Sequence, residues 1–254
     1  MLAWGGGAIA EDALTFADMA AGRAKVIDLT HALNGDNAYW PGENYAPFKL
    51  NTIATLEKNG VLSKAFARPE HLGTHIDAPN HFARGQIAVD QIRPEDLLGH
   101  GVVIDVAAQA SENADLLLGV EHLKAWESKY GQIPEGAIVL VNIGWHRHWG
   151  NAARHQNRDP RGQMHFPRFA AEAAKFLISE RKVRGIGIDT MSIDYGLSRD
   201  FAVHKLVNGA GRYGLESMAQ LDKLPAKDFF LLVAPMKIET GSGAPTRIFA
   251  ILPK

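Results

Sequence analysis

The stretch HLGTHIDAPNHF, residues 71–82, gathers three histidines, one aspartate, one glycine and one proline into a short segment. A helix is disfavoured here by the glycine, by the β-branched threonine and isoleucine, and by the proline. In an extended chain, residues of the same parity share a face. All four ligand-type side chains have odd numbers and can therefore point the same way: His71, His75, Asp77 and His81.

The spacing of these side chains predicts a metal site. His75 and Asp77 would lie about 6.6 Å apart along a strand, within chelating reach of one ion. His71 would lie about 13 Å from His75 in a straight strand, so a bend is required, and Gly73 occupies the position where it is needed. The proline two residues before His81 can likewise turn the chain back toward the site. Imidazole and carboxylate donors together suit Zn²⁺, Mn²⁺ or Fe²⁺. The alternative is a chance cluster among the eleven histidines of the chain.

The composition excludes several classes of protein. The 254 residues are 46% hydrophobic and 22% charged, with a net charge of -1, which is ordinary for one globular domain. No long basic run appears, so we expect neither nucleic acid nor a membrane surface as a partner. No apolar stretch approaches the roughly 20 residues of a membrane span, and the first residues lack the basic segment of a signal peptide.

The chain contains no cysteine. This excludes disulfides, a cysteine nucleophile and every thiolate metal site. A metal must therefore be held by His, Asp, Glu and other nitrogen or oxygen groups. The absence of cysteine also fits a cytoplasmic setting.

Hydrophobic runs predict a set of strands separated by helices, as in a single α/β domain. Several runs are continuously apolar, as expected of strands that are covered on both faces. The predicted strands are residues 25–33, 101–108, 137–145, 183–189, 229–236 and 246–252.

Helical periodicity appears at residues 9–21, 119–131 and 167–182. In the last of these, Pro167 suits a first helical position. Residues 34–48 have the composition of a loop, and the polar segment 154–166 is predicted to be a surface excursion. We expect an N-terminal helical extension over residues 1–24 and one domain over residues 25–254.

The complete pattern H-x-G-T-H-x-D-x-P-x-H, over residues 71–81, resembles the signature of the cyclase family of metal-dependent hydrolases. That family includes bacterial kynurenine formamidase and isatin hydrolase. Other segments along most of the chain are similar to it as well: IDLTHALNGDNAYWPGE, NIGWHRHW, GIGIDTMSIDYG, FAVHKLVNGAGRYGLES and LLVAPMKIETGSGAPTRIFAIL. The resemblance implies an α/β fold of the swivelling β/β/α type, with a mixed, largely antiparallel barrel-like sheet and flanking helices.

The resemblance also implies roles for individual residues. The last histidine of the motif, His81, would be the general acid/base. The family's distal His and Glu lie twelve residues apart, which is the spacing of His204 and Glu216. The implied ligands of one or two Zn²⁺ or Mn²⁺ ions are then His71, His75, Asp77, His204 and Glu216.

Amide hydrolysis follows from such a set of ligands. A bound divalent ion lowers the pKa of its water from about 15.7 toward roughly 7, and the resulting hydroxide attacks an amide carbonyl. A neutral His81, with an unperturbed pKa near 6.5, can take a proton from the water and return one to the leaving nitrogen. We therefore predict a metal-dependent amidohydrolase of the arylformamidase or cyclic amide hydrolase type. Its substrate would be small and aromatic or cyclic, similar to N-formylkynurenine of tryptophan catabolism, isatin or a cyclic imide.

Substrate-binding residues are predicted on three segments. Tyr39, Trp40 and Phe48 can wall a pocket for an aromatic substrate; the alternative is that they only cap the core. The amide of Asn80 is expected near the pocket, where it can bind a carbonyl or carboxylate. Ser192 is expected to line the site.

Several further polar residues carry weaker expectations. Asp194 is expected beside the site, whereas Asp189 is expected to make structural hydrogen bonds at a strand end. We expect His146 and His148 on the surface or at an interface, and His31 as a hydrogen-bonded structural histidine.

Two other classes of protein share parts of this pattern. His75-x-Asp77 with the distant His204 has the order of the two-histidine, one-carboxylate triad of non-haem iron oxygenases. That reading leaves Glu216 and the other motif histidines unexplained. A non-catalytic, metal-stabilised binding protein is the other alternative, and the intact His81 argues against it because a structural site gains nothing from a free acid/base.

The resemblance implies a homodimer or homotetramer. The apolar segment MLAWGGGAIA, residues 1–10, has no evident place in a core and is expected to pack on a partner subunit. The chain is longer than the short formamidases of the family, and the additional residues lie largely before residue 25 and around residues 150–166. This difference in length favours the isatin hydrolase-like branch.

Overall fold

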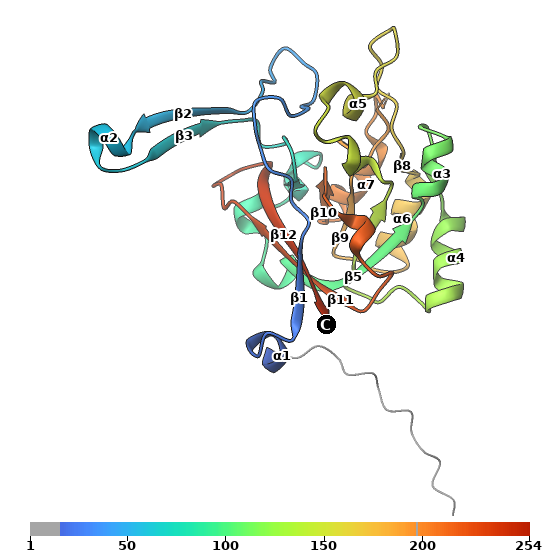
Figure 1. The fold of residues 1–254 in the computed structure, drawn as a ribbon. Coiled ribbons are helices and arrows are strands. Elements are labelled where there is room, and N and C mark those ends of the chain that lie inside the picture. Colours follow the sequence, from blue (N-terminus) through green and yellow to red (C-terminus); the bar gives the residue numbers. More distant parts are fainter. Residues whose placement is uncertain (1–15, 197) are drawn as a thin grey trace, which may run out of the picture.

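The computed structural model describes residues 16–196 and 198–254, which form a barrel-like sheet flanked by helices (Figure 1). Seven strands close into a ring in the order β12-β11-β5-β7-β9-β10-β4, because β4 pairs with both β10 and β12. Strands β4 and β1 pair with the same edge of the long strand β12. Strand β4 pairs with the first residues of β12, and β1 pairs with its last residues. The strands of this sheet are β1 (Ala24–Asp28), β4 (His75–Asp77), β5 (Leu98–Asp105), β7 (Ile138–Asn142), β9 (Gly185–Ile188), β10 (Tyr213–Glu216), β11 (Phe229–Pro235) and β12 (Gly243–Pro253).

The sheet is mixed, as the sequence predicts. Strands β5, β7, β9 and β10 are parallel neighbours, and the other five of the eight pairings are antiparallel. The closed sheet and its helices confirm the expected fold class.

The remaining elements surround this sheet. The helices are α1 (Phe16–Ala20), α2 (Leu56–Asn59), α3 (Ala107–Glu112), α4 (Val120–Tyr130), α5 (Ala152–Gln156), α6 (Ala171–Ser179) and α7 (Ala202–Gly209). Short 3₁₀ helices are η1 (Pro79–His81), η2 (Val89–Gln91), η3 (Pro94–Leu97), η4 (Trp145–His148) and η5 (Leu221–Lys223). Two small sheets pair β2 (Lys49–Ala54) with β3 (Ser63–Ala67), and β6 (Leu117–Leu118) with β8 (Arg168–Phe169).

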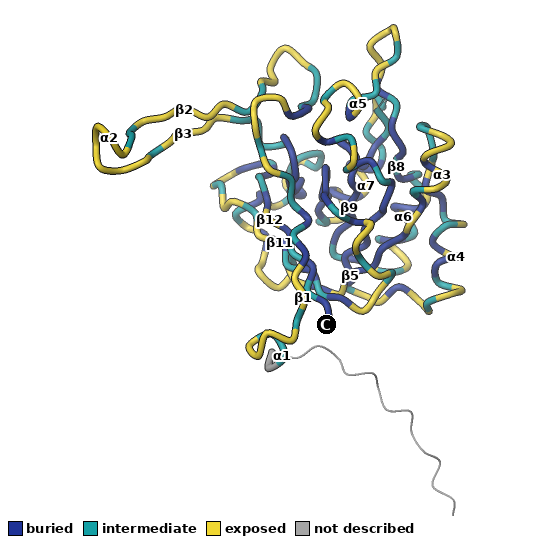
Figure 2. Tube along the Cα trace, viewed as in Figure 1, coloured by how far each residue is buried: buried dark blue, intermediate teal, exposed yellow. Residues whose placement is uncertain are grey.

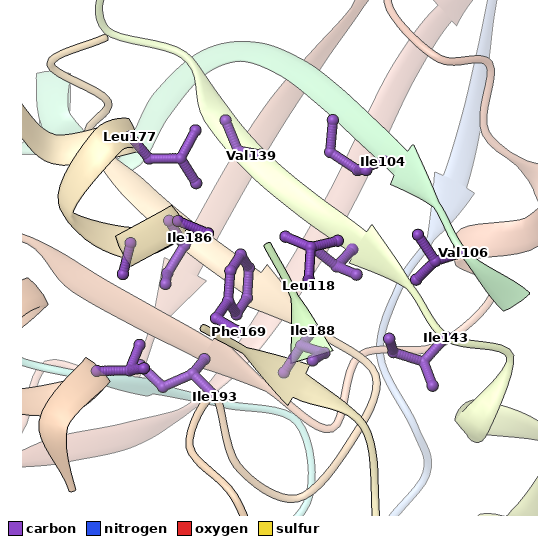
Figure 3. Close-up of a cluster of buried hydrophobic side chains, with 14 of the residues drawn as sticks. Ile104, Val106, Leu118, Val139, Ile143, Phe169, Leu177, Ile186, Ile188 and Ile193 are labelled. Atoms are coloured by element: carbon purple, nitrogen blue, oxygen red, sulfur yellow. The ribbon is translucent and has the colours of Figure 1, made fainter. Parts of the chain in front are cut away.

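Two hydrophobic cores lie on opposite faces of the parallel strands. Val102 and Ile104 of β5 belong to the core covered by the helices, whereas Val103 between them belongs to the core inside the ring. Helices α4 and α6 contribute Leu123 and Leu177 to the first core, part of which Figure 3 shows. Residues 101–104, 138–141 and 185–188 are buried on both faces, and they are accordingly apolar residues and glycine.

Most predicted elements are present with shifted ends. Helix α4 confirms the prediction over 119–131, but α6 begins at Ala171 rather than at Pro167. The reason is that Arg168 and Phe169 form strand β8, which pairs with β6. The predicted N-terminal helix is described only from Phe16, where α1 begins, and its earlier part lies outside the described residues together with the segment 1–10.

The prediction of a surface excursion over 154–166 was wrong for its apolar and aromatic members. Met164 and Phe166 are buried in the helix-covered core, and His155 of α5 is 0% exposed. The prediction relied on the polar composition of the segment as a whole, which gives no indication that these three residues are buried. In the part of the chain that the structure describes, no helix is long and apolar enough to cross a membrane.

The buried His155 predicts an acid-sensitive contribution to stability. Burial lowers its pKa to about 3, while the unfolded side chain titrates near 6.5. The unfolded state therefore binds more protons between these values, and stability is lost as the pH falls from 6.5 toward 3. Between pH 7 and pH 4.5, the unfolding free energy of the wild type should fall by roughly 3 kcal/mol more than that of His155→Phe, which has no titrating side chain at this position. Denaturant unfolding of both proteins at the two pH values measures this difference, and identical pH dependence would contradict the assignment.

Candidate metal centre

Strands β4 and β10 carry the centre of the candidate site. They pair antiparallel, and His75 lies directly opposite Glu216. Asp77 follows two residues later and points to the same side as His75, while Ile76 between them is buried in the core. Antiparallel pairing thus brings one imidazole and two carboxylates together from segments far apart in the sequence.

A bend at Gly73 brings His71 beside this pair. Gly73 has a φ of +68°, a left-handed conformation that favours glycine. A Cβ at this position would lie 2.5 Å from the side chain of Leu33. The sequence-based expectation of a bend between His71 and His75 is therefore met at this residue.

The ring of His75 is fixed with one nitrogen facing the two carboxylates. Its Nδ1 lies 2.7 Å from the carbonyl oxygen of Gly73 and must donate, because a carbonyl only accepts. Its Nε2 is buried and has no hydrogen-bond partner among residues 16–196 and 198–254, although it lies 3.2 Å from Asp77 Oδ1 and 3.4 Å from Glu216 Oε2. Close approach without hydrogen-bond alignment is the arrangement of donor atoms that share a cation.

The ring of His204, on α7, is held in the same way from the other side. Its Nδ1 donates to Asp194 Oδ2 at 2.7 Å, and the Asp194 carboxylate also accepts the backbone N–H groups of Val203 and His204. Nε2 of His204 then lies 3.1 Å from Glu216 Oε1 and 3.2 Å from Asp77 Oδ2. A carboxylate behind a histidine fixes the tautomer and orientation of metal-binding imidazoles.

A relay through Ser242 orients His71. The Ser242 hydroxyl donates to Glu70 Oε2 at 2.6 Å, so it accepts from Nε2 of His71 at 2.9 Å. Nδ1 of His71 is left facing Asp77 Oδ1 at 2.6 Å. The sequence singled out neither Glu70 nor Ser242, and no spacing pattern connects Ser242 with a histidine 171 positions away.

His81 lies at the edge of this cluster. Its ring stacks on that of His71, with centroids 3.8 Å apart and an interplanar angle of 18°. It also meets the ring of His204 edge-on at 5.8 Å. Burial lowers the pKa of His81 to about 4, so the imidazole is neutral at pH 7 and able to accept a proton.

The carboxylates make a centre that requires positive charge. Burial alone would lower the pKa of His75, but Asp77 and Glu216 outweigh it and raise this pKa to about 10. Burial also opposes the charged form of His204, whose pKa is nevertheless held well above its usual value by Asp194, Asp77 and Glu216. Without a metal, imidazolium ions must balance the carboxylates, because buried charges need partners. The donor set therefore fits a divalent cation, which allows both imidazoles to be neutral ligands.

Five of the candidate ligand residues form two overlapping groups, to neither of which His204 belongs. His71, Asp77 and His81 form one, and His75, Asp77 and Glu216 form the other, with the atoms of each group within 4.8 Å of one another. Asp77 belongs to both groups, and these residues would hold one divalent ion or two.

A cavity of about 100 Å³ opens onto these residues. Of the predicted substrate-binding residues, Tyr39, Trp40 and Ser192 line it. Phe48 does not, and its ring instead packs against Phe66 with centroids 6.2 Å apart. Asn80 also lies outside the lining, and its buried Oδ1 has no hydrogen-bond partner in the described part of the chain. The structure adds six wall residues that the sequence did not single out: Ala38, Tyr45, Phe82, Met191, Phe201 and Ser217.

Of the other polar residues, Asp189 is placed as expected, whereas His31 and His146 depart in part from expectation. Asp189 accepts the backbone N–H groups of Ile143 and His146 at the end of β9, which is the structural role predicted for it. His31 stacks on Trp149 with centroids 4.5 Å apart, and its Nε2 has no hydrogen-bond partner among the described residues. His146 is bound by Asp189 and is only partly exposed.

Known proteins with similar sequences are hydrolases. A family model described as "Putative cyclase" matches residues 27–195. An isatin hydrolase of Roseibium aggregatum is 31% identical over 94% of this chain and 95% of its own length. A kynurenine formamidase of Bacillus cytotoxicus is 30% identical over 87% of this chain and 94% of its own length.

Solved structures agree with the sequence relatives. Isatin hydrolase A from Ralstonia solanacearum superposes with a TM-score of 0.87 and 37% identity, covering 96% of this chain and all of that one. An isatin hydrolase bound to the product analogue thioisatinate also has a TM-score of 0.87, with 31% identity over 94% of this chain and 96% of that one.

Proposed function

Because the chain belongs to the cyclase family of metal-dependent hydrolases, we propose that it hydrolyses the amide bond of a small cyclic or aromatic substrate with the help of a bound divalent cation. The observation that carries this proposal is the buried, unpaired Nε2 of His75 between the carboxylates of Asp77 and Glu216. The named relatives act as hydrolases, which favours this function over an iron oxygenase or a non-catalytic binding protein.

The proposed ligands are His71, His75, Asp77, His204 and Glu216, holding one or two Zn²⁺ or Mn²⁺ ions. When bound, a divalent ion lowers the pKa of a coordinated water toward neutrality and polarises a carbonyl oxygen. The chain contributes the orientation of its donors. Gly73 and Asp194 each hold an Nδ1–H, which leaves the Nε2 lone pairs of His75 and His204 directed into the site.

His81 is proposed as the general acid/base. Its depressed pKa, lowered by burial to about 4, keeps a ring nitrogen free to accept a proton at neutral pH. The same ring can then deliver that proton to the leaving nitrogen of the amide. Stacking on His71 fixes its plane beside the donors.

The cavity wall favours an uncharged ring as substrate. Tyr39, Trp40, Tyr45, Phe82 and Phe201 supply aromatic surface, and the part of the wall that the structure describes includes no lysine or arginine. A substrate carboxylate would therefore lack an ion-pair partner among these side chains, which supports a neutral cyclic amide over an amino-acid amide.

A substrate panel tests the proposed function. We expect chelator-treated protein to regain hydrolysis on addition of Mn²⁺ or Zn²⁺, with kcat/KM for isatin or a cyclic imide at least about tenfold above that for N-formylkynurenine. The same assays under nitrogen should give unchanged rates. Activity that requires dioxygen, or hydrolysis that is indifferent to metal removal, would contradict the proposal.

The hydrogen-bonded chain Glu70–Ser242–His71 gives a prediction that tests whether Ser242 orients the His71 ring. Ser242→Ala frees Nε2 of His71 from its partner, and loss of such an outer partner typically weakens metal binding about 10–100-fold. Calorimetric titration of the apoprotein with Mn²⁺ or Zn²⁺ measures this change. Ser111→Ala, at an exposed serine of α3, is the matched control. Unchanged metal affinity in Ser242→Ala would remove the relay from the account.

A homodimer or homotetramer is proposed as the working assembly, following the family resemblance. The cytoplasmic setting stays a prediction from composition.

A further inference from the structure

A second cavity, of about 640 Å³, lies between the end of strand β5 and helices α3 and α4. These two helices lie next to each other at the edge of the molecule (Figure 1), and Figure 2 shows that α4 alternates between buried and exposed residues. Among the described residues, none lines both this cavity and the cavity of the metal centre. Small-molecule sites enclose roughly 300–1,000 Å³. The size of the second cavity therefore suits a small organic ligand.

Helix α4 supplies an aromatic wall to this cavity. The rings of Trp126 and Tyr130 have centroids 5.1 Å apart and an interplanar angle of 42°, and both residues line the cavity. A spacing of four residues places them on one face of α4. Leu224 and Ala226, between η5 and β11, add apolar surface. A flat apolar ring is the kind of group that such a wall binds.

The indole of Trp126 carries a hydrogen-bond donor without an acceptor. Trp126 is 7% exposed, and its buried Nε1 has no hydrogen-bond partner in the part of the chain that the structure describes. An indole N–H only donates, and buried polar groups are almost always hydrogen-bonded. We therefore expect a molecule bound in the cavity to supply the acceptor.

The described part of the cavity wall contains one lysine and one acidic residue. Nζ of Lys129 lies 4.8 Å from the centroid of the Tyr130 ring, and it forms no ion pair with any described residue. Asp105 uses its Oδ1 to accept the backbone N–H of Ala107 at the start of α3. The charge of the lysine is therefore available to a ligand, and it favours an anion.

A hydrogen bond between α3 and α4 orients a further donor. Nε2 of His122 lies 2.9 Å from Oε1 of Gln109 and must donate, because an amide oxygen only accepts. The NH₂ group of Gln109 is then left without a hydrogen-bond partner among the described residues. Both side chains line the cavity, so the wall offers donors from two helices.

We propose that this cavity binds a small aromatic carboxylate. The ring of the ligand would pack against Trp126 and Tyr130, and its carboxylate would accept hydrogen bonds from Lys129 and from the indole N–H. Trp126 and Lys129 are three residues apart on α4, which places their Cβ atoms about 5–6 Å apart, so that both donors can reach the two oxygens of one carboxylate. The NH₂ group of Gln109 is a third donor for the same anion. The inference concerns a site separate from the metal centre and holds whichever amide the chain hydrolyses.

Calorimetric titration of the protein as purified with benzoate tests this inference. Benzamide and benzylamine present the same ring without the negative charge, and we expect benzoate to bind at least about tenfold more tightly than either. Lys129→Met and Trp126→Phe should each weaken benzoate binding about 10–100-fold, the effect of losing a hydrogen bond to a charged group. Lys175→Met, at an exposed lysine of α6 outside the cavity, is the matched control and should bind benzoate as the wild type does.

The variants also separate this cavity from the metal centre, because carboxylates bind to metal ions as well. Lys129 is exposed, so its substitution should leave the fold intact, which circular dichroism checks. Benzoate that binds only at the metal centre would bind equally to the wild type and to Lys129→Met, and this result would overturn the inference. Benzoate that does not bind, or that binds no more tightly than benzamide, would overturn it as well.

Discussion

His75→Ala is expected to lose bound metal and hydrolase activity together. The substitution removes the one imidazole whose Nε2 is buried, unpaired and within 3.4 Å of both Asp77 and Glu216. It leaves those carboxylates with His204 and His71 as their neighbouring imidazoles, so that any remaining ion would be bound by fewer ligands. Metal affinity should fall by more than about 100-fold, beyond the usual effect of losing an outer partner, and turnover should fall to background.

Metal analysis and steady-state kinetics on the same preparations check this expectation. His100→Ala, at an exposed histidine of β5, is the matched control and should keep both metal and activity. His75→Asn keeps a polar side chain at the position and guards against a variant that fails to fold. A His75→Ala protein that binds metal with wild-type affinity would exclude His75 as a ligand.

His81→Ala is expected to separate chemistry from metal binding. If this ring moves the proton, kcat should fall about 10²–10⁴-fold, the usual span for a positioned acid/base, while metal content stays near that of the wild type. Burial lowers the pKa of His81 to about 4, and a neighbouring cation would lower it further. The neutral form is therefore present above this pKa and is lost as the pH falls through it. The acid limb that this ionisation gives the wild-type profile, at or below about pH 4, should disappear in the variant.

Two other outcomes for His81→Ala have defined meanings. Near-normal turnover with full metal content would remove His81 from the mechanism. Loss of the metal would make His81 a ligand, in line with its place in the donor group with His71 and Asp77. Glu216 would then be the first candidate for the base.

Strands of the sheet could be predicted from the sequence where their burial requires a run of apolar residues. Strands β5, β7 and β9 contain the fully buried stretches 101–104, 138–141 and 185–188, which consist of apolar residues and glycine. Strands β2 and β3 escaped prediction because neither face is buried within one chain, so no hydrophobic period distinguishes them from loop. Closure of the ring also left no signal, since β4 has only three residues and pairs with β12 near the far end of the chain.

The residues of the candidate site likewise include some that the sequence indicated and others that only the structure identifies. The motif could be interpreted as a metal site because it gathers imidazole and carboxylate side chains at close spacing, whereas the distal pair, His204 and Glu216, was inferred only from the resemblance to the family. The Ser242–Glu70 relay was not readable, because a serine hydroxyl acquires its role only through the fold. The placement of Phe48 outside the cavity lining follows from its contact with Phe66, on a strand that the sequence did not predict.

Anomalous diffraction from crystals grown with Mn²⁺ or Zn²⁺ tests the central claim most directly. The account predicts one or two anomalous peaks at about 2.0–2.2 Å from Nε2 of His75, Nε2 of His204 and the carboxylate oxygens of Asp77 and Glu216. A second peak, if present, should share Asp77 with the first and lie beside His71. The absence of any peak at these side chains in crystals that hold the metal elsewhere would contradict the claim.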